Sequence, residues 1–442
     1  MTRFLGVDIG TTFLKGAVLD LGIRAVQHVR RLPMPGPVEG LPATRYELDP
    51  DAVLSAVRQL LSELLRAAPD ATGLVICSQV HCLVLLDQNG NPKSNIITWK
   101  DQRSLEPSQH GKGTLFDELS RTVSAEEQRQ LGGEMRVGVP ITTLFALRDR
   151  GELLPDNYAS SLSDFVIASL CKVEPTTEPT LASAHGLYHI EHSDWHHELI
   201  ARLGFSKLLW PRIRRPGEQV GVTNIDGHRL TCYTPIGDQQ CALLGAELQE
   251  GELSLNISTG SQASLISSDL PRGDFQVRPY FDGKWLRTIV SVPAGRSLGV
   301  LVDLLSEMSR STDHPIARPW DYIRTAVDRI HTTDIEVDLS FFASLTGDRG
   351  SITNIHEGNL TIGHLFAAAF RTMATNYSRC ANLLSPDRQW NRVVFSGGLA
   401  LGFPRLRQGI LGILGNPAHR LCTTEEDTLA GLRMFAMTYS GN

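Results

Sequence analysis

The sequence predicts an α/β protein made of two similar domains that face each other across a cleft. Short apolar segments alternate with helical stretches along most of the chain, which is typical of α/β architecture. Each half also opens with two apolar strands joined by a turn that contains Gly and Thr, at residues 4–19 and 253–267. The alternative at this point is a chance likeness of two hairpins. We expect the boundary between residues 247 and 252, which gives domains 1–248 and 249–442.

The elements of the first half follow from apolar patterning and turn residues. Pro50 begins a helix capped by Asp49, because apolar residues recur on one face through Leu64. The turn at 87–92 ends a strand, since it is rich in Asn, Asp and Gly. The expected strands are 1–9 (apolar from residue 4), 14–19, 25–31, 72–77 and 82–86.

The second half is read in the same way. A long apolar face predicts a helix over 360–384, and residues 396–400 join a strand to a further helix. Residues 424–427 are expected to cap a final helix that ends near Tyr439. The expected strands are 253–257, 263–267 and 392–395, and the other expected helix is 404–413.

Composition excludes several classes of protein. The 442 residues contain 42 Lys+Arg and 48 Asp+Glu, a net charge of −6, and 41% of them are hydrophobic. Such a chain is neither disordered nor basic enough to bind nucleic acid or anionic membranes without specificity. It has no run of ~18 apolar residues and no signal-peptide pattern. The seven cysteines form no C-x-x-C pair, so we expect reduced thiols, no zinc site and a cytoplasmic location.

The first turn is a candidate phosphate and metal site. Asp8 ends a strand, Gly10, Thr11 and Thr12 follow, and Lys15 lies three residues further on. Backbone N–H groups and hydroxyls of such a turn bind phosphate oxygens, and an Asp at a strand end holds Mg²⁺ directly or through water. The alternative is an ordinary hairpin turn. No G-x-x-x-x-G-K-[ST] loop is present, which disfavours a P-loop fold.

Asp238 is the candidate general base. It follows Gly237 at the start of a helix of small and apolar residues, where the helix dipole favours the ionised carboxylate. An ionised carboxylate accepts a proton at neutral pH. The alternative is a simple helix N-cap, because Asp is among the best capping residues.

Two turns of the second half are candidate nucleotide sites. Thr259 and Gly260 form a second small polar turn between strands, and Gly397 and Gly398 stand between a strand and a helix. Paired glycines allow a base or phosphate to approach the backbone closely. Close packing of strand and helix is the alternative for the glycine pair.

Two polar segments of the first half suit a polyol pocket. Gln79 and His81 form one, and Trp99, Asp101 and Arg103 form the other. These side chains hydrogen-bond hydroxyl groups, and Trp packs on a sugar face. The alternative is a hydrogen-bonded core histidine and an Asp–Arg pair on the surface.

Taken together and in this order, the segments resemble the FGGY carbohydrate kinases. The likeness covers nearly the whole chain: residues 6–12 resemble the first phosphate motif, 78–81 the G-Q-M-H segment, 99–103 the W-x-D-x-R sugar segment, 237–238 the catalytic Asp motif, 258–260 the second phosphate motif and 396–400 the adenosine motif. Ser78 and Val80 depart from the family pattern. Several motifs in family order outweigh the separate alternatives.

Within the family the chain is most similar to sedoheptulokinases. Segments 163–166, 217–221, 237–240, 255–259 and 360–364 carry this likeness. Xylulokinases share His81 and residues 99–103, and are the near alternative. Glu178-Pro179 stands where many relatives have Thr-Asp.

The resemblance implies two ribonuclease H-like domains of the actin, hexokinase and Hsp70 ATPase type, and the transfer of phosphate from ATP to a terminal hydroxyl of a ketose. The implied cofactors are ATP and Mg²⁺. The implied partner is a small-molecule sugar, and no nucleic acid or membrane is expected as a partner. A homodimer is the assembly considered for the chain. The implied roles are catalytic for Asp238; metal-binding, through water, for Asp8; substrate-binding for Gln79, His81, Trp99, Asp101, Arg103 and Gln239; and nucleotide-binding for Gly10, Thr11, Thr12, Lys15, Thr259, Gly260, Gly397 and Gly398.

A hypothesis from another class is a non-catalytic, nucleotide-dependent binding protein on the same fold, because fold alone does not determine function. Asp238 distinguishes the two hypotheses, since a non-catalytic relative needs no carboxylate at that helix start.

Overall fold

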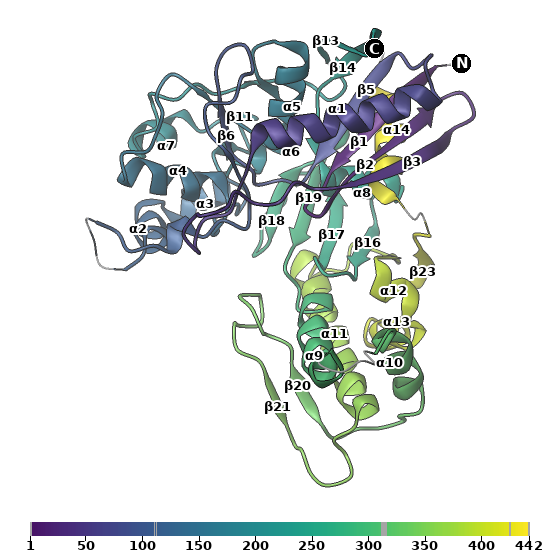
Figure 1. Ribbon diagram of the computed structural model, residues 1–442. Helices are drawn as coiled ribbons and strands as arrows, with labels where there is room; N and C mark the ends of the chain where they lie inside the picture. Colours follow the sequence, from purple (N-terminus) through teal and green to yellow (C-terminus); the bar gives the residue numbers. More distant parts are fainter. Residues whose placement is uncertain (1, 110, 112, 311–315, 424–425, 441–442) are drawn as a thin grey trace. The chain divides into compact units, whose positions relative to one another are not determined.

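A computed structural model of the chain describes residues 2–109, 111, 113–310, 316–423 and 426–440 (Figure 1). The chain forms two compact units. Unit 1 comprises Met1–Glu247, Val277–Lys284 and Thr424–Asn442, and unit 2 comprises Leu248–Gln276 and Trp285–Thr423.

Most helices belong to unit 1. They are α1 (Pro50–Ala67), α2 (Leu115–Thr122), α3 (Ala125–Gln130), α4 (Pro140–Asp149), α5 (Leu162–Cys171), α6 (Pro179–Ser183), α7 (His197–Arg202), α8 (Asp238–Gly245) and α14 (Asp427–Tyr439). The helices of unit 2 are α9 (Gly295–Arg310), α10 (Pro319–Asp328), α11 (Ile362–Leu384), α12 (Gly398–Gly402) and α13 (Pro404–Ile413).

Each unit contains one large sheet. The sheet of unit 1 holds β1 (Arg3–Ile9), β2 (Phe13–Asp20), β3 (Ala25–Pro33), β5 (Gly73–Ser78), β13 (Gln219–Ile225), β14 (His228–Tyr233) and β15 (Ile236–Gly237). The sheet of unit 2 is built on β16 (Glu252–Asn256), β17 (Gln262–Ser267), β19 (Trp285–Ile289), β22 (Arg392–Ser396) and β23 (Ala418–Leu421), and β18 (Gln276–Pro279) begins at the last residue of a unit 2 segment.

Short strand pairs complete the described structure. They are β4 (Glu47–Leu48) with β7 (Ile96–Ile97), β6 (Val84–Leu86) with β8 (Tyr158–Ser160), β9 (Thr176–Thr177) with β12 (Arg212–Ile213), β10 (Tyr188–His189) with β11 (Asp194–Trp195), and β20 (Glu336–Asp338) with β21 (Ser351–Thr353). Single 3₁₀ turns lie at Arg103–Leu105 and Phe281–Gly283.

The two large sheets repeat one topology. The sheet of unit 1 contains the order β14-β5-β1-β2-β3, with β13 added next to β14, and the sheet of unit 2 contains the order β23-β22-β16-β17-β19, with β18 added next to β19. In each, the opening hairpin is antiparallel, and its first strand has a parallel neighbour on the other side, β5 beside β1 and β22 beside β16. The repeated order agrees with the two similar domains that the hairpins predict.

Helix α1 forms as its sequence predicts and covers one face of the first sheet (Figure 1). The Asp49 side chain accepts a hydrogen bond from the Asp51 amide, and the apolar face through Leu64 is buried. Gly16 of β2 makes room for this helix, because a Cβ there would lie 2.9 Å from Leu64 Cδ1. Helix α1 and strand β2 therefore pack closely at Gly16, as is usual in a protein interior.

The predicted single division of the chain near residue 248 needs correction. Unit 1 also contains Val277–Lys284 and the C-terminal helix α14. The reason is hydrophobic: Leu429, Leu432 and Phe435 of α14 are fully buried in one cluster with Phe4 of β1, and Phe281 stacks at a tilt on Phe435 with ring centroids 5.8 Å apart. The predicted capping residues 424 and 425 lie outside the described residues, as does Met1.

The remaining differences from the predicted elements are small. Helix α11 begins at Ile362 rather than 360, because Thr361 caps it by accepting a hydrogen bond from the His364 amide. The strand expected over 82–86 forms a strand only from Val84.

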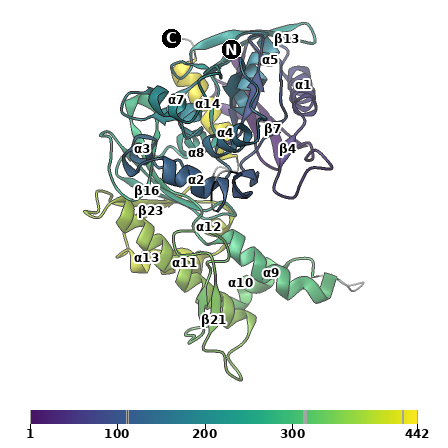
Figure 2. The same ribbon diagram turned by 90° about the vertical axis from the view of Figure 1, so that its left-hand side faces the viewer.

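In unit 2, α11 packs against α10 and α13 (Figure 2). All seven cysteines are free. Within the described ranges, we find no helix that combines the length and the apolar character needed to cross a bilayer.

Candidate active site

Unit 1 gathers its candidate chemistry at the carboxyl ends of three neighbouring strands. Strands β1 and β15 both run parallel to β5, with Asp8 and Ile236 each in register with Cys77. Since parallel strands end at the same edge of a sheet, Asp8 near the end of β1 and Asp238 just after β15 come to one edge. Gln79 follows β5 at this edge, so strand order explains why residues far apart in sequence meet here.

Asp8 lies in a charged, buried environment. Its carboxylate accepts a hydrogen bond of 2.7 Å from the Thr428 hydroxyl, and Lys15 Nζ lies 3.7 Å away. Lys15 also pairs with Glu426 at 3.0 Å, and Arg31 donates to the same Glu426. Burial raises the pKa of Asp8, although Thr428 and Lys15 both stabilise its ionised form. Lys15 is therefore bound to carboxylates of unit 1, one of which is the predicted metal ligand.

Asp238 is the first residue of α8, and the N-cap position is occupied by Gly237. The alternative that Asp238 is the N-cap is therefore wrong. The expectation of a fully ionised carboxylate also needs correction: burial raises the pKa of Asp238 to about 7, and the nearby charge of Asp8 adds to the rise. Desolvation outweighs the helix dipole, so this group exchanges a proton near neutral pH.

A hydrogen-bond relay holds Gly237, the last residue of β15 and the neighbour of Asp238. The Gly237 amide donates to Thr180 Oγ1 at 2.9 Å, and the Thr180 hydroxyl donates to Glu178, the N-cap of α6. The Thr180 amide also donates to Glu178 at 2.8 Å. Glu178 is fully buried, and burial raises its pKa to about 8. Glu178 therefore points into the relay, and Pro179 is the first residue of α6.

The first phosphate turn and the sugar segment meet at Gln79. The Thr11 hydroxyl donates to Gln79 Oε1 at 2.9 Å, and the Trp99 indole N–H lies 3.1 Å from the same oxygen. Gln79 Nε2 lies 3.4 Å from the Gly10 carbonyl. Trp99 nevertheless leaves 44% of its surface exposed, so its ring is available to a ligand. Thr12 is exposed at the same turn.

His81 and Gln239 join a buried charged cluster that sequence reasoning missed. We call it the Glu134 cluster; it comprises His81, Glu134, Arg136, Gln239 and Arg278. Arg278 Nε donates to Glu134 at 2.5 Å and its Nη1 donates to Gln239. Burial alone would raise the pKa of Glu134, but the Arg278 and Arg136 charges outweigh it and lower that pKa to about 2.

The reason for the omission is positional. Arg278 enters from a short segment that lies thirty-nine residues beyond Gln239 in sequence. Glu134 and Arg136 follow the pair Gly132 and Gly133, which signals a loop but no chemistry. Thr180 was missed for the same reason, since its sequence context shows only a helix start.

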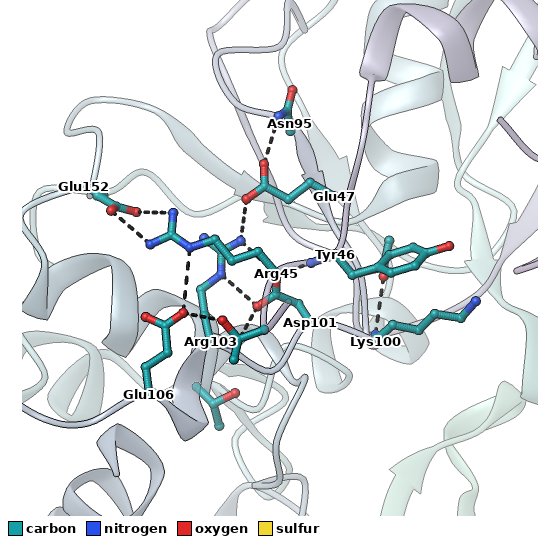
Figure 3. Close-up of polar contacts among 12 residues, drawn as sticks. Arg45, Tyr46, Glu47, Asn95, Lys100, Asp101, Arg103, Glu106 and Glu152 are labelled. Atoms are coloured by element: carbon teal, nitrogen blue, oxygen red, sulfur yellow. Dashed lines mark hydrogen bonds and ion pairs between the residues drawn. The ribbon is translucent and has the colours of Figure 1, made fainter. Parts of the chain in front are cut away.

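Asp101 and Arg103 bind each other in a buried ion pair (Figure 3). Arg103 donates to both oxygens of Asp101, at 2.8 and 2.9 Å, and to Glu47 at 2.5 Å. Asp101 also accepts from the Tyr46 amide at 2.8 Å. The alternative interpretation placed this Asp–Arg pair on the surface, but the pair is buried. Both carboxylate oxygens of Asp101 and the Nε and Nη2 groups of Arg103 are engaged within the protein. The pair holds the loop that carries Trp99.

Unit 2 brings its four predicted nucleotide residues to the ends of two adjacent strands. Asn256 of β16 is in register with Ser396 of β22, so the turn with Thr259 and Gly260 lies beside Gly397 and Gly398. Thr259, Gly260 and Gly398 are exposed. Gly397 has φ 87°, and a Cβ there would lie 2.6 Å from the Ile257 carbonyl. Only glycine therefore fits this position.

The acidic groups at the edge of the unit 1 sheet fit the chemistry of Mg²⁺. Asp8 and Asp238 offer hard oxygen ligands, and each repels the negative charge of the other, which a divalent cation would relieve. In the part of the chain that the structure describes, no three His, Cys, Asp or Glu side chains are grouped to hold a metal. Mg²⁺ is commonly held by one or two carboxylates together with water and substrate phosphates.

Comparisons with known proteins find relatives among the sugar kinases. Residues 3–245 match the family model described as the FGGY family of carbohydrate kinases, N-terminal domain. Sedoheptulokinase from Mus musculus is 23% identical over 417 residues, which is 84% of each chain. Xylulose kinase from Streptomyces coelicolor is 27% identical over 274 residues, 60% of this chain and 55% of that one.

A solved structure confirms the predicted fold class. Plasmodium falciparum glycerol kinase, solved with ADP, superimposes with a TM-score of 0.82 at 18% identity, over 98% of this chain and 89% of that one. The fold is therefore the two-domain ATPase fold of actin and hexokinase. The matched family and both relatives above are kinases, which favours an enzyme over a non-catalytic binding protein on this fold. The matched model covers more than half of the residues, and the chain accordingly belongs to the FGGY family of carbohydrate kinases.

Proposed function

We propose that this carbohydrate kinase transfers the γ-phosphoryl group of ATP to a terminal hydroxyl of a ketose, with Asp238 as the general base. The observation that carries the proposal is the environment of Asp238. Asp238 begins a helix at the edge where Asp8 lies near the end of β1, and burial raises the pKa of Asp238 to about 7. A base with a pKa near the working pH accepts a proton efficiently.

In the reaction, Asp238 takes the proton of the sugar hydroxyl while that oxygen forms a bond to the γ-phosphorus. The bond from this phosphorus to the bridging oxygen of ADP breaks, and ADP leaves with the electron pair. Phosphoryl transfer depends mainly on positioning and on stabilising charge. We assign phosphate contacts to Thr11, Thr12, Lys15, Thr259 and Gly260, and adenosine contacts to Gly397 and Gly398. Mg²⁺, held through Asp8, would neutralise phosphate charge.

We assign the sugar to the exposed face of Trp99 and to the polar groups beside it. Gln79 and Gln239 lie next to Thr11 and Asp238 respectively, so both belong to the same edge of the sheet. Asp101 and Arg103 contribute by holding the loop of Trp99, because both Asp101 oxygens and the Arg103 Nε and Nη2 groups are already engaged in the ion pair and with Glu47.

The proposed substrate is a linear ketose of the sedoheptulose type, and a pentulose such as xylulose or ribulose is the second candidate. The sedoheptulokinase relatives support the first and the xylulose kinase relatives support the second. A longer ketose has more hydroxyls, and a buried group left unpaired by a shorter sugar costs roughly 1–3 kcal/mol. The preferred sugar should therefore gain about tenfold or more in kcat/KM.

A coupled assay of ADP release over ketoses and polyols tests the proposal. We expect the highest kcat/KM for sedoheptulose, with ATP and Mg²⁺ both required. A higher kcat/KM for xylulose or ribulose would replace the substrate but retain the kinase. Failure to phosphorylate any sugar of the panel would reject the proposed reaction.

A further inference from the structure

Both ring nitrogens of His81 are already hydrogen-bonded inside the protein. Nδ1 lies 2.8 Å from the Ala184 carbonyl, and Nε2 lies 2.7 Å from Arg136 Nη2. A carbonyl only accepts, so Nδ1 carries the hydrogen and Nε2 accepts from the guanidinium. Burial and the Arg136 charge lower the pKa of His81 to about 3, which keeps the ring neutral. His81 therefore has no N–H left to donate to a sugar.

The backbone fixes the direction of this ring. His81 has φ 61°, a left-handed conformation that is unusual for a residue with a side chain, and the residue is buried. Such conformations persist where the surrounding structure requires them, and they concentrate at functional sites. In this case the conformation directs Nε2 toward Arg136.

Arg136 differs from the other arginine of the Glu134 cluster. Arg278 is almost fully buried and donates to Glu134 and Gln239. The Arg136 side chain is 32% exposed, donates one bond to His81, and lies 3.7 Å from Glu134. A guanidinium presents several N–H groups in one plane, and it suits pairs of acceptor oxygens. Arg136 thus retains donors for a ligand.

The cluster links Arg136 to the proposed base. Glu134 contacts both arginines, Arg278 contacts Gln239, and Gln239 follows Asp238. Arg136 is therefore joined by a continuous chain of polar contacts to the residue beside Asp238. A sugar bound with its terminal hydroxyl at Asp238 has further hydroxyl groups that can accept hydrogen bonds from the Glu134 cluster.

We propose that Arg136 is a specificity-determining residue that donates hydrogen bonds to hydroxyl oxygens of the sugar, and that His81 is a positioning residue that acts through it. This inference rests on the proposed function. It replaces a direct sugar contact by His81 with an indirect role. Arg136 also supplies the donor geometry that lysine lacks.

The test is a double-mutant cycle on the full chain with the best sugar of the panel. Arg136→Gln should raise the KM for the sugar by about tenfold or more, as expected when a hydrogen bond to substrate is lost, and change kcat by less than about threefold. The KM for ATP should stay unchanged. His81→Asn, chosen because Asn tolerates positive φ, should raise the sugar KM in the same way. The double variant should equal Arg136→Gln alone.

Two further variants act as controls. Arg129→Gln removes an exposed arginine that pairs with Glu126 on the nearby helix α3, and it should leave both KM values unchanged. Arg136→Lys keeps the charge without the planar fork, and it should raise the sugar KM less than Arg136→Gln does. Thermal melting of each variant establishes that it is folded.

The outcomes separate this inference from the proposed function. An unchanged sugar KM in a folded Arg136→Gln enzyme overturns the role of Arg136. Effects of His81→Asn and Arg136→Gln that multiply overturn the positioning role, because each residue would then contact the sugar independently. A wild-type enzyme that phosphorylates no sugar overturns the proposed function, and this inference with it.

Discussion

At the residue scale, two properties of Asp238 have opposite effects on the ionisation of its carboxyl group. Its position at the first turn of α8 favours the ionised form, whereas burial and the charge of Asp8 favour the protonated form. The pKa of about 7 shows that burial prevails. The carboxyl can therefore take up a proton and release it again within one catalytic cycle.

Replacing Asp238 by Asn should lower kcat by ~10²-fold or more, which is the usual size of a general-base effect. Asn keeps the size of the side chain and removes the proton acceptor. The coupled ADP assay measures kcat, and thermal melting should show a folded enzyme. Asp226→Asn is the matched control, because Asp226 is exposed in the β13–β14 turn at φ 50°, where Asn fits well. Wild-type kcat in Asp238→Asn would reduce Asp238 to a structural residue.

The pH dependence of kcat/KM should report the same group. The base acts only when it is deprotonated, so kcat/KM should rise with pH and level off above about 7. The sign follows from the raised pKa: at lower pH Asp238 holds a proton and cannot take another. A profile of kcat/KM from pH ~5.5 to ~9 measures the midpoint. A midpoint near the ordinary pKa of an exposed Asp would contradict this assignment.

At the scale of elements, α6 and β15 are joined by one buried relay. Gly237 donates its amide to Thr180, and Thr180 donates to Glu178. The relay fixes the end of β15, directly before Asp238 begins α8. The cost of breaking it includes the desolvation of a buried amide, which is ~1–3 kcal/mol.

Thr180→Val tests this relay with a side chain of nearly the same shape. The variant should lower the melting temperature, because the Gly237 amide loses its acceptor, and it should lower kcat more than it raises the sugar KM. Thr180→Ser restores the hydroxyl and should recover most of both losses. Steady-state kinetics and thermal melts of the two variants provide the comparison. A Val variant with wild-type melting temperature and kcat would contradict the relay, because Val keeps the methyl group and lacks only the hydroxyl.

At the scale of the whole molecule, the chain distributes phosphate-type turns over both units. Thr11 lies in unit 1, whereas Thr259 and Gly397 lie in unit 2. The backbone passes between the units after Glu247, Gln276, Lys284 and Thr423. We predict that one nucleotide engages both sets of turns and holds the units closed around it, which would also exclude water that hydrolyses ATP.

Small-angle scattering tests this closure. The radius of gyration should decrease when the sugar and a non-hydrolysable Mg-nucleotide are added together, relative to the ligand-free protein. Either ligand alone should give a smaller decrease. An unchanged radius with both ligands would count against closure.

The sequence alone determined the parts of this protein that depend on local pattern. Alternating apolar segments predicted an α/β fold, and the helix from Pro50 with its Asp49 cap formed as expected. The repeated turns at Thr11 and Thr259 indicated two similar halves. Local chemistry also predicted roles for Asp8 and Asp238, because a strand end and a helix start are visible from neighbouring residues, and the structure brings both residues to one edge of the sheet.

Only the tertiary structure decided the rest, because contacts between residues far apart in sequence leave no local signal. Arg278 reaches Gln239 through a short segment of the second half, and α14 returns to pack on the first sheet. Burial likewise depends on the assembled fold: it raised the pKa of Asp238, neutralised His81 and turned the Asp101–Arg103 pair inward. Local propensity determines which elements form, whereas desolvation and long-range packing determine which side chains remain free to bind a substrate.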